Sequence, residues 1–100
     1  MKRYVLSPAA TADLEQIAAF LDEHAPHATD AVLSRIRAAM RRIASTPGLG
    51  HLRKDLADEP ERFVAVWSYL VVHRVTIPVE IVRVVHGARD VARALRARPR

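Results

Sequence analysis

Basic side chains gather in the second half of the chain, where strand-like segments dominate. Such a set could clamp a phosphate and stabilise the transition state of phosphoryl transfer, with His86 exchanging a proton near neutral pH. It could equally pair with acidic side chains of a partner protein. The members of this basic cluster are Arg53, Lys54, Arg62, Arg74, Arg83, His86 and Arg89. The residue types alone therefore leave both phosphate chemistry and protein binding open.

Arg83 has an unusual place in the cluster, because it interrupts the apolar run of residues 79–86. The stem of an arginine can pack among apolar neighbours, here Ile81 and Val85. Its guanidinium can meanwhile reach a carboxylate such as Asp90. For this residue we therefore expect a structural role.

Several other chemistries have no support in the sequence. No serine lies in a Gly-x-Ser-x-Gly setting, and the three glycines form no phosphate-binding loop. The chain has no cysteine, which excludes disulfides and thiolate metal sites. Glu23, His24 and His27 could be imagined as metal ligands, but they flank a helix break at Pro26, where surface histidines are common. We expect no metal and no cofactor.

The composition suits one folded domain, since the chain has 100 residues and half of them are hydrophobic. We expect this domain over residues 1–96 and a basic C-terminal tail over residues 97–100. The net charge is +5, and residues 89–100 contribute +4 through five arginines and one aspartate. An excess of this kind suits nucleic acid or an acidic protein partner.

Export and membrane insertion are not indicated. No run approaches the ~20 apolar residues of a membrane span. Residues 1–4 are followed at once by strand and helix signals rather than by the pattern of a signal peptide. The lack of cysteine also allows a reducing compartment. We expect a cytoplasmic protein.

The elements that must position the basic cluster begin with a strand and two helices. Residues 3–6 predict a short strand, after which Ser7 is a good N-cap and Pro8 a good first helical residue. A second helix is expected to begin at Pro26, and the short connection predicts an antiparallel hairpin. The apolar stripes are Ala10, Leu14, Ile17 and Leu21 in the first helix, and Val32, Ile36, Ala39, Met40 and Ile43 in the second.

A polar loop is predicted over residues 47–61, with three strands after it. The strands are expected over residues 63–67, 69–75 and 79–86, and a short helix or an extended tail follows over residues 90–96. This order predicts an α+β fold, in which the N-terminal strand joins the three later ones and the helical hairpin packs on a mainly antiparallel sheet.

Alternation places apolar residues on both faces of the predicted sheet. In the last strand, one face is expected to carry Val79, Ile81, Arg83 and Val85, and the other Glu80, Val82, Val84 and His86. One helical hairpin covers only one face, so the second needs another cover. A partner chain, the chain's own tail and a second copy of the chain all stay open.

Four segments, taken in order, resemble a known family. They are "YVLSPAATADLEQIAAFL", "ATDAVLSRI" in the second helix, the "TPGLG" turn and "VEIVRVVHGARD". The set resembles the ParE branch of the RelE/ParE toxin superfamily over residues 3–95. The resemblance implies a toxin of a bacterial type II toxin–antitoxin system. It also implies a cognate ParD-like antitoxin that lies over the toxin in a hetero-oligomeric complex and neutralises it.

Two activities compete within that superfamily. RelE-like members are ribosome-dependent ribonucleases that cut messenger RNA with basic residues and usually a late aromatic, whereas ParE-like members block DNA gyrase. This chain has no tyrosine, phenylalanine or tryptophan after Tyr69. We therefore interpret it as a protein-binding gyrase inhibitor rather than an enzyme, with no sequence-specific DNA binding of its own. A departure from the family is His73-Arg74, where an aromatic more often precedes the arginine, and this bears on partner specificity.

The resemblance assigns two alternative sets of site residues. For binding of the target or the antitoxin, the set is Arg62, Arg74, Arg83, His86, Arg89, Arg93 and Arg96. If the chain is instead a RelE-like mRNA endoribonuclease, catalysis falls to Lys54, Arg62, Arg83 and His86. A third alternative is a non-toxic member of the superfamily that is kept as an antitoxin-binding protein.

Overall fold

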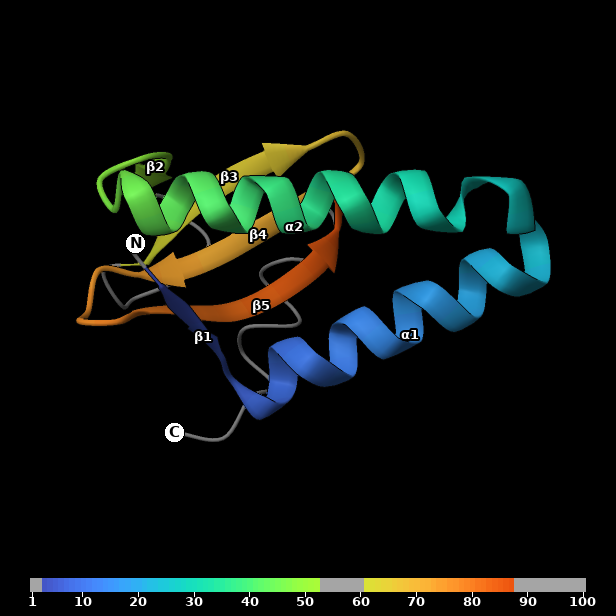
Figure 1. Ribbon diagram of the computed structural model, residues 1–100, viewed down its shortest axis with the longest axis horizontal. Coiled ribbons are helices and arrows are strands. Elements are labelled where there is room, and N and C mark those ends of the chain that lie inside the picture. The colour runs from blue at the N-terminus through green and yellow to red at the C-terminus, as the bar shows by residue number, and fades with distance from the viewer. Residues whose placement is uncertain (1–2, 53–60, 88–100) are drawn as a thin grey trace.

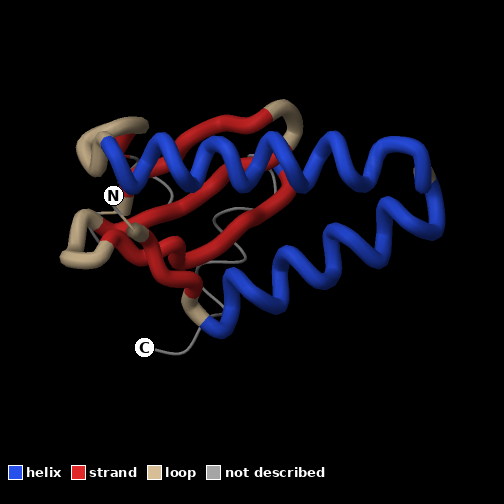
Figure 2. Tube along the Cα trace, viewed as in Figure 1, coloured by secondary structure: helices blue, strands red, loops and turns tan. Residues whose placement is uncertain are grey.

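A helical hairpin packs on one face of a five-stranded mixed sheet, as Figures 1 and 2 show, which confirms the predicted α+β class. The computed structural model describes residues 3–52 and 61–87. The elements in chain order are β1 (Tyr4–Leu6), α1 (Pro8–His24), the 3-10 turn η1 (Pro26–Ala28), α2 (Thr29–Ser45), β2 (His51–Leu52), β3 (Arg62–Val66), β4 (Tyr69–Arg74) and β5 (Val79–His86). The predicted helix or tail over residues 90–96 and the domain boundary at residue 96 lie outside the described residues.

The start of α1 is fixed by Ser7, as predicted. Its side-chain oxygen accepts a hydrogen bond from the backbone N–H of Ala10 at 3.0 Å, and Pro8 occupies the first turn. The same hydroxyl donates to the backbone carbonyl of Val82 at 2.7 Å. Ser7 therefore both begins the helix and ties the β1–α1 junction to β5.

Packing of α2 follows the predicted stripe, since Val32, Ile36, Ala39, Met40 and Ile43 are all buried. Pro26 does not begin this helix itself. It begins η1, and α2 starts three residues later at Thr29. The Thr29 hydroxyl donates to Asp22 of α1 at 2.7 Å, which links the two helices at their junction.

The strand order is β1-β5-β4-β3-β2, with β1 parallel to β5 and every other pair antiparallel. The predicted antiparallel pairing of the last two strands is confirmed. The predicted polar loop over residues 47–61 contains a strand that the sequence pattern does not show, because β2 pairs through only two residues, His51 and Leu52.

A register shift between Val72 and His73 changes the faces predicted for β5. Val72 pairs with Arg83 and His73 pairs with Ile81, so β5 holds one extra residue at this bulge. Val79, Ile81 and Val84 consequently belong to the core cluster under the helices, whereas Val82 and Val85 belong to a second cluster. The faces predicted for Ile81 and Val82 are confirmed, and the expectation of unbroken alternation along β5 is wrong beyond Val82.

The second cluster lies on the face of the sheet opposite to the helices. Its buried members are Phe63, Val72, Val82 and Val85, with Leu70 packed against them. None of the four buried members exceeds 6% exposure, although the structure holds a single chain. These four side chains are therefore shielded from water within the single chain.

Candidate functional site

Arg83 is held by a carboxylate from the other end of the chain. Its Nε donates to Asp13 Oδ2 at 2.7 Å, and its Nη2 donates to Asp13 Oδ1 at 2.8 Å. Asp13 lies on α1 and is buried, and its hydrogen bonds raise the pKa of the Arg83 guanidinium. The structural role expected for Arg83 thus has a partner 70 residues away. Asp90, the carboxylate named from the sequence, lies outside the described residues.

Asp13 also closes the outer edge of β5, where β1 has already ended. Its Oδ2 accepts the backbone N–H of Val84 at 2.9 Å. Nearer to β1, the backbone N–H of Ser7 donates to the carbonyl of Ile81 at 3.0 Å. Backbone groups that β1 leaves unpaired thus find partners on the β1–α1 segment. We call this region of β5 the closed edge. It is formed by Arg83 on β5 together with Ser7 and Asp13 of the β1–α1 segment.

Arg74 lies at the far end of β4, between two carboxylates. Its guanidinium is 3.7 Å from an oxygen of Glu61 and 3.7 Å from one of Glu80. Glu61 is only 1% exposed, so its charge depends on such a partner. Glu80 is the residue that pairs with Arg74 across β4 and β5. Much of the positive charge of Arg74 is therefore balanced within the chain.

Arg62 and His73 are cross-strand neighbours at the same end of the sheet. Arg62 donates to the carbonyl of Gly50 at 3.2 Å. His73 is fully buried, and its Nε2 lies 3.0 Å from the carbonyl of Pro47, so this nitrogen carries the proton. Burial lowers the pKa of His73, and the charge of Arg62 lowers it further against the opposing effect of the Pro47 carbonyl. His73 is consequently a neutral structural histidine near pH 7.

His86 lies at the opposite end of the sheet, where it is exposed and meets the ring of Tyr69 edge-on at 5.2 Å. Arg62 pairs with His73 and His86 pairs with Tyr69, so their partners lie four positions apart along β4. This corresponds to roughly 13 Å along the strand. The structure therefore does not bring Arg62, Arg83 and His86 into one constellation. The remaining predicted site residues, Lys54, Arg89, Arg93 and Arg96, lie outside the described residues.

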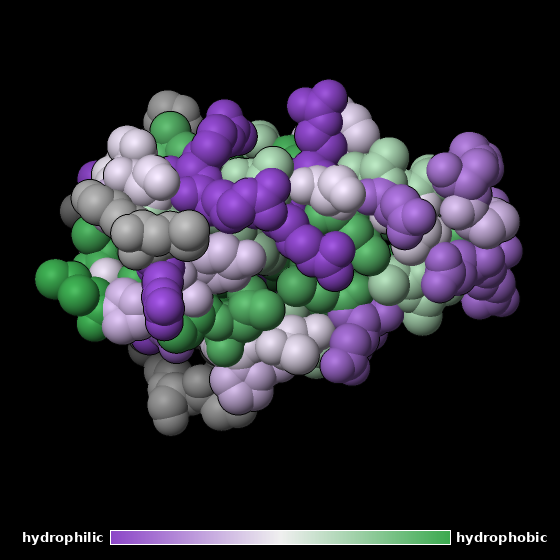
Figure 3. Space-filling model, viewed as in Figure 1, coloured by the Kyte–Doolittle hydropathy of each residue, from purple (hydrophilic) through white to green (hydrophobic). Residues whose placement is uncertain are grey.

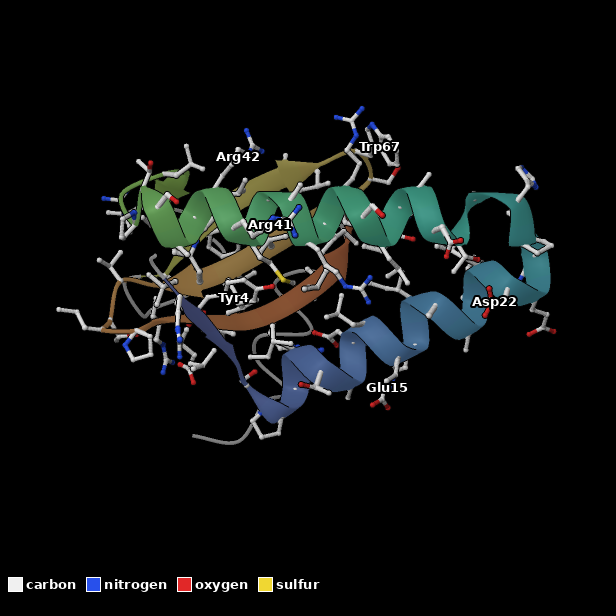
Figure 4. All side chains as sticks on the ribbon, viewed as in Figure 1. Tyr4, Glu15, Asp22, Arg41, Arg42 and Trp67 are labelled. Atoms are coloured by element: carbon white, nitrogen blue, oxygen red, sulfur yellow. The ribbon has the colours of Figure 1, made fainter. Side chains whose placement is uncertain are left out.

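A second basic surface, which the sequence reasoning did not select, lies between α2 and β3. A depression of about 390 Å³ is lined by Arg35, Ala38, Ala39, Arg42, Ala65, Val66 and Trp67. The Arg35 guanidinium lies over the Trp67 ring, 5.0 Å from its centroid. Figure 4 shows Arg42 and Trp67 projecting on the same side of the molecule. We name this region the α2–β3 depression. The spacing of Arg35 and Arg42, which places both on one side of a helix, is the sequence signal that points to it.

Trp67 is held in a rare backbone conformation, with a φ of +53° in the two-residue turn between β3 and β4. Residues other than glycine seldom adopt positive φ, and the bulky ones least of all. Its side chain is 58% exposed, although it is the only tryptophan in the chain. Burial in the core therefore does not explain why a large aromatic occupies this turn.

The fold and these surfaces define a small α+β protein with arginine-rich edges. Over residues 3–52 and 61–87, no three His, Asp or Glu side chains gather into a possible metal site. Neither helix in this described part has the length and apolar character that a membrane span requires.

Residues 4–91 match the family described as the ParE toxin of the type II toxin–antitoxin system parDE. The match extends over most of the chain, and the protein belongs to this ParE toxin family. The resemblance noted in the sequence is thereby confirmed. No curated protein matches the sequence.

A solved structure has a similar fold. A chain from the chromosomal ParDE TA system from P. aeruginosa superimposes with a TM-score of 0.71 at 18% identity. The superposition covers 87% of the present chain and 97% of the other. At this identity the likeness is one of fold alone.

Proposed function

We propose that this protein is the toxin of a ParDE-type module in the cytoplasm. It inhibits DNA gyrase and so blocks replication and growth, and a cognate ParD-like antitoxin neutralises it by direct binding in a hetero-oligomeric complex. The observation that carries this proposal is the family match over residues 4–91. The similar fold of a chain from a solved ParDE system supports it.

Inhibition by binding accords better with the described basic residues than cleavage of RNA does. A nuclease needs its cationic groups around one phosphate, but Arg62 and His86 lie at opposite ends of the sheet. Arg83 already binds Asp13 in a bidentate geometry. The absence of an aromatic residue after Tyr69 agrees with this view.

The predicted binding residues divide by accessibility. His86 is exposed and Arg74 is partly exposed, so both can meet a partner directly. We assign Arg83 a positioning role, because its guanidinium is engaged by Asp13. Arg62 supports the connection around Gly50. Arg89, Arg93 and Arg96 stay predictions for partner contact.

The test is controlled expression of the chain alone and together with the small protein encoded beside it, followed by assays of the purified toxin. We expect growth arrest and a DNA-damage response with the chain alone, rescue by the neighbouring protein, and loss of supercoiling by purified gyrase. Intact gyrase activity with ribosome-dependent cleavage of mRNA would establish the RelE-like alternative. Normal growth with a stable complex would establish a non-toxic antitoxin-binding protein.

A further inference from the structure

We propose that the α2–β3 depression binds an acidic, extended segment of a partner protein, which adds to the sheet as a strand beside β3. Two carboxylates of the segment pair with Arg35 and Arg42. The inference rests on the proposed function in one respect, since it takes the neutralising antitoxin as the partner that carries this segment.

The first support is the open backbone edge of β3. Over the described residues, β2 pairs only with Arg62 and Phe63, so no strand lies beside the last three residues of β3. In a two-residue hairpin the residues next to the turn, here Val66 and Tyr69, form the hydrogen-bonded pair. The N–H and C=O groups of the preceding residue, Ala65, therefore point away from β4. Ala65 is exposed and offers both groups to an added strand.

The second support is the positive charge along the α2 side of the depression. Arg35 and Arg42 are seven residues apart on α2, which places them on one side of the helix about 10 Å apart. Within the described chain, neither forms an ion pair. Figure 3 shows hydrophilic side chains in a band over α2. Two guanidinium groups without a carboxylate partner favour an acidic ligand.

The third support is the shape between the two arginines. Ala38 and Ala39 are the small residues that leave the depression hollow on the side of α2. Trp67 stands at the end of the hollow, where its exposed ring can cover an aliphatic side chain of an incoming strand. Tryptophan and arginine are among the residues that contribute most of the binding energy at protein interfaces.

The dimensions favour a peptide over a nucleic acid. Residues that share one face of a strand are an even number of positions apart, about 7 Å for two positions and about 13 Å for four. A spacing of about 10 Å lies between these values, so the two acidic residues of the segment should be two or four positions apart. Single-stranded nucleic acid could also use arginines and a tryptophan. The sugar–phosphate backbone has no regularly spaced amide groups to pair with the edge at Ala65, however, whereas the backbone of an acidic peptide does.

The experiment measures binding of the small protein encoded beside this chain to the purified full-length toxin. Because Trp67 is the only tryptophan of the toxin, its emission reports on the depression itself. The double variant Arg35→Gln/Arg42→Gln should weaken the complex at least about tenfold. The matched control is Arg37→Gln/Arg41→Gln, which removes the same charge from exposed positions of α2 that do not line the depression. This control should change the affinity by less than about threefold.

A second variant separates strand addition from charge. Ala65→Pro removes the outward N–H without removing a ladder hydrogen bond to β4, and should weaken the complex by a similar factor. Thermal unfolding checks that this variant folds. If it does not fold, the affinity of the Arg35→Gln/Arg42→Gln variant tests the proposal.

The outcomes distinguish the two proposals. If the neighbouring protein does not bind the wild-type chain, the proposed function fails. If it binds the wild type and all variants equally, with unchanged Trp67 emission, the proposed function stands and this inference is overturned. Tight binding of a 20-nucleotide single strand that depends on Arg35 and Arg42, and with which the neighbouring protein does not compete, would also overturn it.

Discussion

The closed edge beside β5 and the α2–β3 depression beside β3 lie toward opposite edges of one sheet, and both carry arginines. At the closed edge, Arg83 is bound twice by Asp13, and Asp13 also accepts a backbone N–H of β5. In the depression, Arg35 and Arg42 have no carboxylate partner among the described residues, and β3 has no neighbouring strand there.

This contrast shows that a basic residue indicates binding only when the fold leaves its charge unbalanced. Arg83 attracts attention in the sequence because it interrupts an apolar strand, yet its guanidinium is used inside the molecule. Arg35 and Arg42 look like ordinary surface residues of a helix, yet they flank a hollow beside an open strand edge. The closed edge should therefore control stability, and the α2–β3 depression should control recognition.

The largest effect should come from breaking the closed edge with Asp13→Ala. The substitution leaves the mostly buried Arg83 charge without this partner, and it removes the acceptor of the Val84 N–H. Loss of one member of a buried pair typically costs about 3–5 kcal/mol. We expect a fall of this size in the free energy of unfolding, measured with urea. Glu15→Ala is the matched control, because Glu15 is an exposed acid on the same helix (Figure 4), and its loss should cost little.

The next effect should come from Gly50→Ala, beside the paired part of β3. Gly50 has a φ of +91°, and an added Cβ would lie 2.7 Å from the Phe63 carbonyl oxygen. The backbone conformation alone costs about 1–3 kcal/mol for a residue with a side chain, and the contact adds to this. Gly48→Ala serves as the control, since no atom lies within 4 Å of its added Cβ. Equal denaturation midpoints for the two variants would show that β2 is not seated against β3 as described.

A pH-dependent effect is expected from His73, which lies in β4 between the two edges. Its pKa in the folded state is below the ordinary value near 6.5, because burial disfavours the charged ring. The unfolded chain therefore binds more protons, so this contribution to stability is complete above about pH 6.5 and declines as the pH falls below that value. Unfolding measured between pH 5 and 8 should show the decline. His73→Gln should flatten it, whereas His27→Gln, at an exposed position, should leave it in place.

The smallest effect on stability should come from Trp67→Gly, which tests the depression. Glycine relieves the positive φ at this position, a gain of about 1 kcal/mol. Loss of the contact with Arg35 offsets about 0.5–1 kcal/mol of it. The thermal midpoint should hardly move, while affinity for the protein encoded beside this chain should fall. A variant with both values unchanged would leave the strained tryptophan without a role in recognition.

Most of the fold could be predicted from the sequence because its signals are local. Ser7 and Pro8 mark a helix start within four residues, and the stripe of α2 repeats at the helical period. Tight turns separate the three later strands at the expected places. The two-residue β2 could not be predicted, since so short a pairing has no period of its own and exists only through its contact with β3.

The candidate site was less predictable, because charge depends on neighbours that are distant in sequence. Asp13 meets Arg83 across 70 positions, and Asp13 looks in the sequence like any polar residue of an amphipathic helix. Arg62 is the first residue of β3 and His86 is the last residue of β5. Both strands run antiparallel to β4, so the two residues lie at opposite ends of the sheet.

The sequence by itself determined the element types, the family resemblance and the apolar stripes, since these follow from propensity and period within short windows. Only the tertiary structure decided which charges are balanced and which face each residue of β5 takes. The bulge opposite Val72 and His73 shows the physical reason. Alternation is a property of one strand, whereas a bulge is created by the pairing of two, and a single extra residue there reverses every side chain that follows.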